Sequence, residues 1–567
     1  MSPFLLKLND LLRDVLQLCG LVLKEDQDFW QPCADERFGD YQTNIAMVLA
    51  KKEGTNPQVL AANFCRIWNE KHAGIGTLSF KGPGFINLRF TPVFLIQIFR
   101  ESKLIPTLEK PKTLVIDFSS PNVAKAMHVG HIRSTILGDS LARVMRFLGH
   151  RVITDNHIGD WGTQFGKLIV GFRKFGSLEK LEKNPIAEME RLYKGAHEAS
   201  EKDPAILEAA RLELKKLQEG DAENLALWEK FRSLSQMAFD RIYEKLGVRF
   251  DYILGESFYN SQLKAVVSDL LSRGIAQESE GAICVFFDLP ELKEKPFLVQ
   301  KSDGAALYAT TDIATLFYRI KEFQPDAIWY VTDSRQTLHF QQLFGTAKKC
   351  GIQTSLVHVT FGTILGADKR PLKTREGEPV KLESLLNEAV ARALELVKER
   401  RADLSEEEQK KIAEVLGIGS VKYADLVQNR HLDYVFDWKK LLAFDGNTAP
   451  YLLNAYVRIQ SLFRKANEIG VREGEIQTEL HKKERELILL LLQWHEVLGQ
   501  VAMEQRPHHL CFYLYRLAGL FHGFFEECPV LRSEPLLRGH RLVICRRVGE
   551  VLKKGCDLLG IQTLERM

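Results

Sequence analysis

The sequence has no paired-cysteine pattern, although it contains nine cysteines. The nine are scattered, their number is odd, and no two of them form a CxxC pair. A disulfide framework uses cysteines in pairs, and a structural zinc site uses clustered thiolates, so the sequence argues against both. We therefore expect a protein of a reducing compartment, the cytoplasm, with no structural metal.

Long apolar runs are also missing. The longest, residues 487–492, is far shorter than the roughly 20 residues that span a bilayer. The first residues do not read as a signal peptide, because Lys7, Asp10 and Arg13 interrupt the apolar positions and leave an amphipathic helix. The sequence thus predicts no membrane partner.

Charge of neither sign dominates the chain. Lys and Arg total 77 and Asp and Glu total 74, which gives a formal charge of +3. A nucleic-acid partner would therefore have to meet a local basic face rather than a globally basic protein. At 567 residues the chain is also too long for a single core, so we expect several domains.

The pattern of apolar residues divides the chain into three regions. Residues 1–110 mix an amphipathic helix with short strand-like pieces, and residues 111–381 alternate strands with helices. A charged helical stretch at about 176–246 interrupts the alternation and is interpreted as an insertion. From 382 to 567 only helical periodicity is found, which predicts an all-α domain.

The second region opens with a βαβ pattern. Residues 113–118 (TLVIDF) are nearly all apolar or β-branched, a helical face runs from about Val129 to Leu148, and a second strand follows at 151–154. A strand, a helix and a strand in this order predict a parallel sheet. Further strands are expected at 283–287, 327–331 and 355–360.

A histidine-containing motif lies at the turn between the first strand and its helix. Residues 128–131 read His-Val-Gly-His. A helix N-terminus offers free N–H groups and a partial positive charge, which bind phosphates. Gly130 allows a flat nucleotide to approach the backbone, and His128 and His131 can both donate hydrogen bonds to phosphate oxygens.

Other readings of this motif remain open. A single histidine is more often structural or solvated than functional. His128 and His131 could also ligate a metal, although no third ligand stands at a useful spacing.

The motif resembles the HIGH signature of class I aminoacyl-tRNA synthetases. The surrounding segment SSPNVAKAMHVGHIRSTILGD, and NHIGDWGTQFG at 156–166, are similar to arginyl-tRNA synthetases in particular. Further similar segments are 255–257, 307–312, 361–377, 456–460 and 558–561.

The resemblance implies an architecture and a reaction. It implies a multidomain α/β protein with a Rossmann-like catalytic domain, a small α+β N-terminal domain that contacts tRNA, and a helical C-terminal domain that binds the anticodon. The implied enzyme activates L-arginine with ATP, accompanied by Mg²⁺, and transfers arginine to tRNA(Arg). Members of the family are usually monomers.

The resemblance also implies an ATP site. His128 and His131 would stabilise the phosphates and Gly130 would make room for adenosine. The family's second signature, KMSKS, is degenerate here, since Arg370 and Lys373 stand at its two basic positions, and Lys125 would compensate. As a solvated loop cation, Lys373 is equally well explained on sequence alone. The expected ATP-binding residues are Pro121, Asn122, His128, Gly130, His131, Arg370 and Lys373, with Lys125, His128, His131 and Lys373 catalytic.

A guanidinium carries five donors and a permanent charge, so a pocket for arginine needs carboxylates. By match to the family these are Glu256 and Asp312, each of which would otherwise be read as a surface acid. Tyr308 would line the cavity. Asn122, Asn156 and Gln336 would bind the polar ends of the amino acid.

Contacts to tRNA are expected from both terminal domains. Basic residues with neighbouring aromatics suit an RNA backbone, but the same charges also suit a solvated helix face. The candidates are Tyr41, Asn44, Tyr456, Arg458, Arg464 and Lys465.

Three rival functions need separating. A nucleotidylyltransferase also carries an HxGH turn, but it does not need the helical tail or the NHIGDWGTQFG segment. A non-catalytic RNA-binding relative would not need Lys125, His128, Glu256 and Asp312 together. A synthetase for another amino acid is distinguished only by a charging assay.

Overall fold

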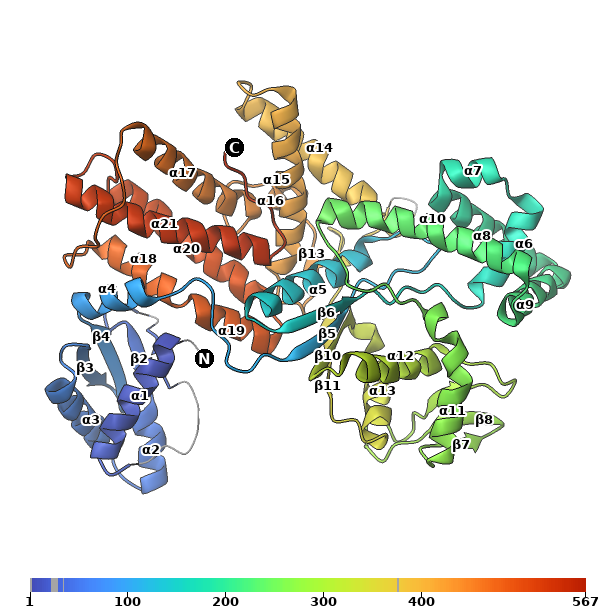
Figure 1. Ribbon diagram of the computed structural model, residues 1–567, viewed down its shortest axis with the longest axis horizontal. Coiled ribbons are helices and arrows are strands. Elements are labelled where there is room, and N and C mark those ends of the chain that lie inside the picture. The colour runs from blue at the N-terminus through green and yellow to red at the C-terminus, as the bar shows by residue number, and fades with distance from the viewer. Residues whose placement is uncertain (1–2, 22–28, 34, 375–376) are drawn as a thin grey trace.

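The computed structural model describes residues 3–21, 29–33, 35–374 and 377–567. Figure 1 shows a small mixed domain, a central sheet flanked by two lobes, and a helical bundle. This arrangement confirms the fold class predicted from the sequence. In the described part of the chain, no helix is both long and apolar enough to cross a membrane.

The N-terminal region is a four-stranded antiparallel sheet with helices packed against it. The strand order is β1-β2-β4-β3, and α3 packs on β3. Thr91 and Asn56 cap α4 and α3 with their side chains, each before a proline at the start of the helix. The elements are α1 (Pro3–Leu18), β1 (Gln31–Pro32), β2 (Tyr41–Thr43), α2 (Ile45–Glu53), α3 (Pro57–Lys71), β3 (Gly76–Lys81), β4 (Phe85–Phe90) and α4 (Pro92–Glu101).

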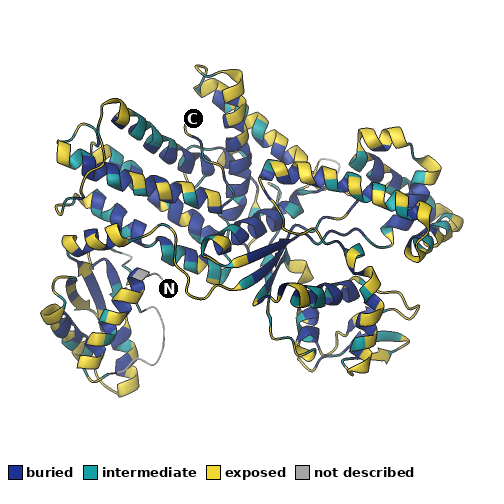
Figure 2. Cartoon of the chain, viewed as in Figure 1, coloured by how far each residue is buried: buried dark blue, intermediate teal, exposed yellow. Residues whose placement is uncertain are grey.

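The central sheet is parallel, as the βαβ pattern predicts. Its strands are β5 (Thr113–Asp117), β6 (Arg151–Asp155), β10 (Ala327–Asp333) and β11 (Ser355–Phe361), in the order β11-β10-β5-β6. Helix α5 (Val129–Phe147) connects β5 to β6. β5, β6 and β10 are largely buried (Figure 2). Because all four strands are parallel, their carboxyl ends bring several loops to one edge of the sheet.

A helical lobe is inserted after β6, and it begins earlier than expected. Helix α6 already belongs to it, because Gly166 and Gly171 let α6 approach α9 and α8 closely: a Cβ at Gly166 would lie 2.1 Å from the carbonyl oxygen of Ala210. The helices are α6 (Gln164–Phe175), α7 (Leu178–Lys183), α8 (Pro185–Lys202), α9 (Pro204–Glu219) and α10 (Ala222–Leu246).

A second lobe lies between β6 and β10. The strand expected at 283–287 forms here as β8, in an antiparallel sheet separate from the parallel one. The elements are η1 (Glu256–Gln262), α11 (Leu263–Ser272), β7 (Ala276–Ser279), β8 (Ala282–Val285), β9 (Phe297–Gln300) and α12 (Tyr308–Phe323). After β10 the chain continues through η2 (Ser334–Gln336) and α13 (Thr337–Lys349).

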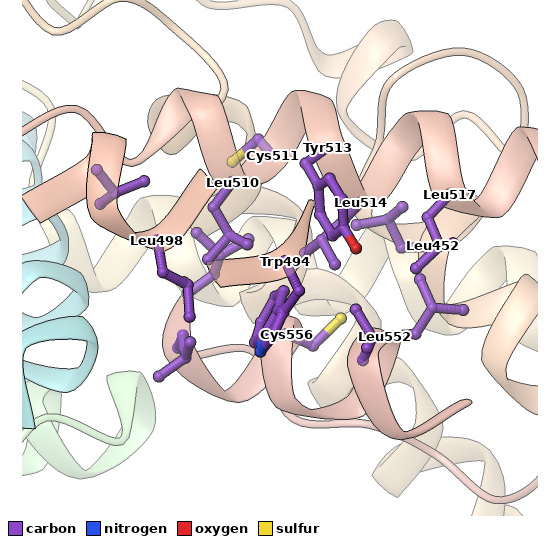
Figure 3. Close-up of a cluster of buried hydrophobic side chains, with 14 of the residues drawn as sticks. Leu452, Trp494, Leu498, Leu510, Cys511, Tyr513, Leu514, Leu517, Leu552 and Cys556 are labelled. Carbon is purple, nitrogen blue, oxygen red and sulfur yellow. The ribbon is translucent and has the colours of Figure 1, made fainter. Parts of the chain in front are cut away.

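The region after residue 382 is helical with one exception. The two-residue strand β13 (Tyr434–Val435) pairs with β12 (Ile364–Leu365), and the sequence reading missed it because the pair is so short. Leucines, Trp494 and Tyr513 fill the interior of the bundle (Figure 3). The helices are α14 (Leu382–Arg400), α15 (Glu406–Leu426), α16 (Trp438–Leu441), α17 (Ala449–Glu468), α18 (Lys482–Leu492), α19 (Trp494–Glu504), α20 (His508–Glu527) and α21 (Pro535–Leu558).

Helix α5 is the junction between the sheet and the bundle. It packs against α14, α15, α19 and α21 as well as the sheet (Figure 1). Arg133 on α5 forms a buried ion pair with Asp425 on α15, with 2.9 Å between Nε and Oδ1. The hydroxyl of Ser140 donates to the carbonyl of Leu558 at 3.0 Å. The motif at the N-terminus of α5 is therefore fixed to both domains.

Candidate active site

The loop from β5 to α5 adopts an unusual backbone conformation. Ser119, Ser120 and Ala124 have φ values of 77°, 48° and 63°, in the left-handed region that residues with a Cβ rarely occupy. Side chains from other elements hold two of these turns. The N–H of Ser120 donates to Oδ1 of Asn156 at 3.0 Å, and that of Ala124 donates to Oγ of Ser235 at 3.1 Å. The surrounding structure thus fixes the path into the motif.

The two motif histidines cap helix α5. Nδ1 of His128 accepts from the N–H of Gly130 at 3.0 Å, and Nδ1 of His131 accepts from the N–H of His128 at 3.0 Å. Because each Nδ1 is an acceptor, each neutral ring carries its proton on Nε2. The caps therefore set the tautomer and leave two Nε2–H donors, with the ring centroids 4.0 Å apart.

Both imidazoles are held neutral. Burial, together with the charge of neighbouring His128, lowers the pKa of His131 to about 3. Burial also lowers the pKa of His128, and the charges of Arg335 and Lys125 act in the same direction. At neutral pH the motif consequently offers hydrogen-bond donors without positive charge.

Gly130 has a packing role beside the expected one. A Cβ at this position would lie 2.8 Å from Cε1 of His128, closer than carbon atoms approach without a shift. Gly130 is exposed on its other side. The glycine therefore allows the His128 cap to form as well as leaving the surface open.

The hydrogen bonds that Nδ1 of each histidine accepts also argue against the alternative that His128 and His131 together ligate a metal. Nδ1 of each ring is already occupied by a backbone N–H, so only Nε2–H faces outward. Among the described residues, no group of three or more His, Cys, Asp or Glu side chains gathers that could hold a metal ion.

The segment carrying the degenerate second signature returns to the motif. The N–H of Val129 donates to the carbonyl of Val380 at 3.0 Å, and the N–H of Leu382 donates to the carbonyl of Met127 at 2.8 Å. Arg370 lies in the exposed stretch between β12 and this pairing. This stretch also carries Lys373, likewise exposed; residues 375–376 lie outside the described part of the chain.

Three other expected ATP-site residues differ in exposure. Lys125 is exposed, with Nζ 5.9 Å from the ring centroid of Tyr193. Asn122 is exposed, whereas Pro121 is buried and its carbonyl accepts from the N–H of Gly159 at 3.0 Å. Pro121 thus contributes backbone structure, while Asn122 and Lys125 present side chains.

Carboxylates gather where the arginine site is expected. Asp312, in the first turns of α12, accepts from Nε2 of His339 at 2.5 Å through Oδ2. Its Oδ1 lies 3.9 Å from Nε2 of His157, whose Nδ1 donates to the carbonyl of Leu254. Two histidines therefore flank Asp312: His339 on α13 and His157 in the loop after β6.

Glu256 faces the same group of side chains. Its pKa is raised to about 7, chiefly by burial, with the negative charges of Asp312 and Asp160 adding to the effect and His157 opposing it. Asp160 is itself buried and accepts from both the N–H and the hydroxyl of Ser257. Without a cation, Glu256 is therefore partly protonated at neutral pH, and a guanidinium would favour its ionised form.

The remaining expected arginine-site residues are placed differently. Tyr308 is 65% exposed at the start of α12, and its ring centroid lies 5.0 Å from that of His339. Gln336 is exposed at the end of η2. Asn156 is fully buried: it accepts from Ser120 and donates to the hydroxyl of Tyr243 at 3.0 Å. The Asn156 amide thus organises the loop of the motif rather than lining an open surface.

Three residues of this cluster were not predicted from the sequence. His157 and Asp160 lie within the NHIGDWGTQFG segment, whose polar character in a region between strand and helix signals a site. His339 lies on one face of α13 and had no local signal, because only the packing of α13 against α12 brings it to Asp312.

The expected tRNA contacts divide by burial. Tyr41 is fully buried and its hydroxyl donates to Oε1 of Glu496 at 3.0 Å, and Tyr456 is 3% exposed. These two side chains form part of the protein core, so the structure does not support them as RNA contacts. Asn44 and Lys465 are exposed, whereas Arg458 lies against the ring of Phe525 and Arg464 donates to the carbonyl of Glu565.

Comparison with known proteins gives matches along the whole chain. Residues 95–438 match the family described as tRNA synthetases class I (R), catalytic domain, residues 452–567 match the DALR anticodon binding domain, and residues 7–90 match the arginyl tRNA synthetase N-terminal domain. An arginine–tRNA ligase of Fusobacterium nucleatum is 44% identical over 94% of each chain. One of Laribacter hongkongensis is 42% identical, covering 99% of this chain and 100% of its own.

Solved structures agree with these matches. The arginyl-tRNA synthetase of Plasmodium falciparum is 29% identical, with a TM-score of 0.81 and full coverage of both chains. That of Thermus thermophilus shares the fold, with a TM-score of 0.84 over 99% of this chain at 23% identity. The chain belongs to the arginyl-tRNA synthetase family.

Proposed function

We propose that the chain ligates arginine to tRNA(Arg) in the site described above. It activates L-arginine with ATP to arginyl-adenylate and pyrophosphate, and then transfers the arginyl group to the 3' terminal ribose. The observation that carries this assignment is the joint presence of a capped HVGH turn and two coupled carboxylates, Glu256 and Asp312, around one sheet edge.

The activation step needs alignment rather than a protein nucleophile. The carboxylate of arginine is ionised at neutral pH and attacks the α-phosphorus of ATP directly. Two anions must approach, and negative charge then moves toward pyrophosphate. Nε2–H of His128 and of His131 would donate to phosphate oxygens, and the pre-set caps hold these donors in place before ATP binds.

Cations at the phosphate side come from exposed loops. Lys125 precedes the motif, and Arg370 and Lys373 follow β12 on the segment that pairs back to it. Mg²⁺ would arrive bound to the triphosphate and neutralise part of its charge. Asn122, exposed beside this turn, would contact either ATP or the amino acid.

Arginine recognition rests on opposite charge. Asp312 and Glu256 would receive the guanidinium, which cannot lose its proton and satisfies two carboxylates at once. His339 would hold Asp312 by its hydrogen bond, and Tyr308 would cover the pocket. Uncharged side chains of similar shape would leave the carboxylates unpaired, which disfavours them strongly.

The terminal regions are assigned to tRNA. Residues 1–110 would contact the body of the tRNA and residues 382–567 the anticodon, with Asn44, Arg458, Arg464 and Lys465 as the candidates whose side chains are not buried. The protein would act as a monomer in the cytoplasm.

Exchange of radioactive pyrophosphate into ATP tests the proposal. We expect exchange that depends on arginine and is strongly enhanced by tRNA(Arg), with no comparable exchange for the other nineteen amino acids. Exchange that no amino acid supports, but that a phosphate-bearing acceptor of the adenylyl group does support, would indicate a nucleotidylyltransferase. Binding of tRNA with no exchange under any condition would indicate a non-catalytic relative, and exchange with a different amino acid would indicate another synthetase.

A further inference from the structure

A fully buried arginine lies beneath the proposed substrate sites. Arg319 belongs to helix α12, and its side chain is 0% exposed. Its Nη2 donates to Oδ2 of Asp117 at 2.7 Å and to Oδ2 of Asp155 at 2.8 Å, and its Nε donates to the same oxygen of Asp155 at 3.2 Å. One guanidinium therefore joins the carboxyl ends of β5 and β6 to a helix of the neighbouring lobe.

Each carboxylate makes a second bond, and each of these bonds leads to a different part of the site. Oδ1 of Asp117 accepts from the hydroxyl of Ser120, in the left-handed turn that leads into the HVGH motif. Oδ1 of Asp155 accepts from the N–H of Leu254, two residues before Glu256. Asp117 and Asp155 are therefore shared between Arg319 and the two loops.

Helix α12 carries the third part of the site. Asp312 lies seven residues before Arg319, which is two turns along the same face, or about 10 Å. Fixing Arg319 against the sheet consequently fixes the position of Asp312 relative to both strands.

We propose that Arg319 is a positioning residue that sets the spacing between the ATP-binding turn and the two arginine-binding carboxylates. This inference rests on the roles given to His128, Glu256 and Asp312 under the proposed function. Arg319 touches neither substrate and acts through Asp117, Asp155 and its own helix.

The chemistry of the cluster suits positioning better than simple cohesion. Buried ion pairs are expensive to desolvate, and apolar side chains of similar volume often stabilise a fold equally well. Here a single cation faces two buried carboxylates, which is a costly way to hold a helix on a sheet. A guanidinium, however, presents its donors in a rigid planar fork, so it fixes direction and distance together.

Arg319→Lys tests the geometry while keeping the charge. Lysine can bond one carboxylate well but cannot reproduce the fork. In full-length protein with saturating tRNA(Arg), we expect the KM for arginine in pyrophosphate exchange to rise about tenfold or more and kcat to fall. The KM for ATP should stay within about twofold, because Asn156 and Ser235 also hold the turn that leads into the HVGH motif. Equal losses in both KM values, or no change in the arginine KM of the folded variant, would overturn the proposal.

Arg541→Lys is the matched control. Arg541 is also buried and pairs with a buried carboxylate, Glu484, at 2.7 Å, but it lies in the helical bundle. We expect a comparable decrease in Tm with unchanged KM values for both substrates. A shift of the arginine KM in this variant too would mean that loss of stability, not position, causes the effect.

Two further variants keep the test decisive. If Arg319→Lys does not fold, Asp155→Asn replaces it, because the amide keeps the shape and an acceptor for Leu254 while weakening the bond to Arg319. Combining Arg319→Lys with Asp312→Asn should raise the arginine KM by less than the product of the two single effects, since the charge of Asp312 that Arg319 positions is already absent. Full additivity would place Arg319 outside the pathway to Asp312.

The proposed function and this inference fail in different ways. If the proposed function is wrong, the unmodified protein will show no pyrophosphate exchange, or Asp312→Asn will leave the KM for arginine unchanged. If both of those behave as expected and Arg319→Lys and Asp155→Asn retain the normal arginine KM, only the positioning role is wrong.

Discussion

The two halves of the active site solve opposite electrostatic problems. In the proposed site the phosphate half would receive an anion, yet its fixed groups are the neutral imidazoles of His128 and His131, and its cations lie on exposed loops. The arginine half would receive a cation, and its carboxylates are partly shielded from solvent: burial raises the pKa of Glu256, and Asp312 is 26% exposed and bonded to His339. The proposed site thus shields its negative charges and leaves its positive charges exposed.

The difference has a physical reason. In the proposed reaction the triphosphate would arrive with Mg²⁺, leave as pyrophosphate and change its charge distribution on the way, so fixed buried cations would hold the product as firmly as the substrate. Arginine keeps its guanidinium charge throughout activation and transfer. A permanent pair of acids therefore serves every step on that side.

Removing a capping histidine should have the largest effect. His131→Ala removes an Nε2–H donor and leaves the N–H of His128 without its acceptor, so we expect kcat for activation to fall on the order of 10²–10³-fold. Single-turnover formation of arginyl-adenylate measures this loss. Binding of tRNA should be nearly unchanged.

His131→Asn separates the two roles of the ring. The asparagine oxygen can still accept from the backbone, but the ring donor is gone, so stability should recover while activity does not. Equal loss of activity and tRNA affinity in His131→Ala would instead identify a structural residue.

Neutralising the arginine half should affect one substrate. In Asp312→Asn the carboxylate that accepts from His339 loses its charge, and we expect the KM for arginine to rise about 10- to 100-fold while the KM for ATP changes little. Steady-state pyrophosphate exchange gives both constants. Asp288→Asn, an exposed acid of the same lobe, is the control and should leave both unchanged.

The pH dependence should separate the two halves further. The pKa of Glu256 is raised to about 7. Below that pH, Glu256 must therefore lose a proton before it can pair with the guanidinium. The KM for arginine should therefore rise up to about tenfold per unit as pH falls below 7. His131, with a pKa of about 3, stays neutral from pH 6 to 8 and contributes no titration to the phosphate half.

The same shift has a consequence for stability. A carboxyl group whose folded pKa lies above its ordinary value favours the folded state most at low pH, and this contribution is lost as pH rises from about 4.5 through 7. Bound arginine should offset the loss, so arginine should raise Tm more at pH 8 than at pH 6. Glu256→Gln should abolish this pH dependence; if the dependence persists, another group is titrating.

The parts predicted from the sequence are those that local pattern determines. The buried strand at 113–118, the helix from Val129 and the strand at 151–154 follow from periodicity and appear as β5, α5 and β6. Phosphate binding at this strand-to-helix turn stays a prediction, and the donors differ from those first expected: the N–H groups of Val129 and Gly130 are already bonded to Val380 and His128, so the imidazoles are the proposed donors. Family resemblance added Glu256 and Asp312, whose letters carry no signal by themselves.

The parts that escaped prediction depend on packing between distant segments. Nothing local marks His339, which meets Asp312 only because α13 packs against α12. Tyr41 was placed at an RNA surface, yet its ring is buried and its hydroxyl bonds to Glu496, 455 residues away in sequence. The amide of Asn156 similarly turns inward to hold Ser120.

The exposed cations should give the smallest effects and the most direct test of the comparison. Lys373→Ala and Arg370→Ala each remove a solvated loop charge, so we expect kcat for activation to fall only a few-fold, in line with the weak coupling of exposed charges. Lys125→Ala, next to the capped turn, should lower kcat more than either.

All three effects should shrink as salt is raised from about 0.05 to 0.5 M, because screening acts on exposed charges first. The Asp312→Asn effect should resist salt, since Asp312 is only 26% exposed and hydrogen-bonded to His339. If Lys373→Ala were instead as damaging as His131→Ala and insensitive to salt, Lys373 would be a fixed element of the phosphate half, and the contrast between shielded acids and exposed cations would not hold.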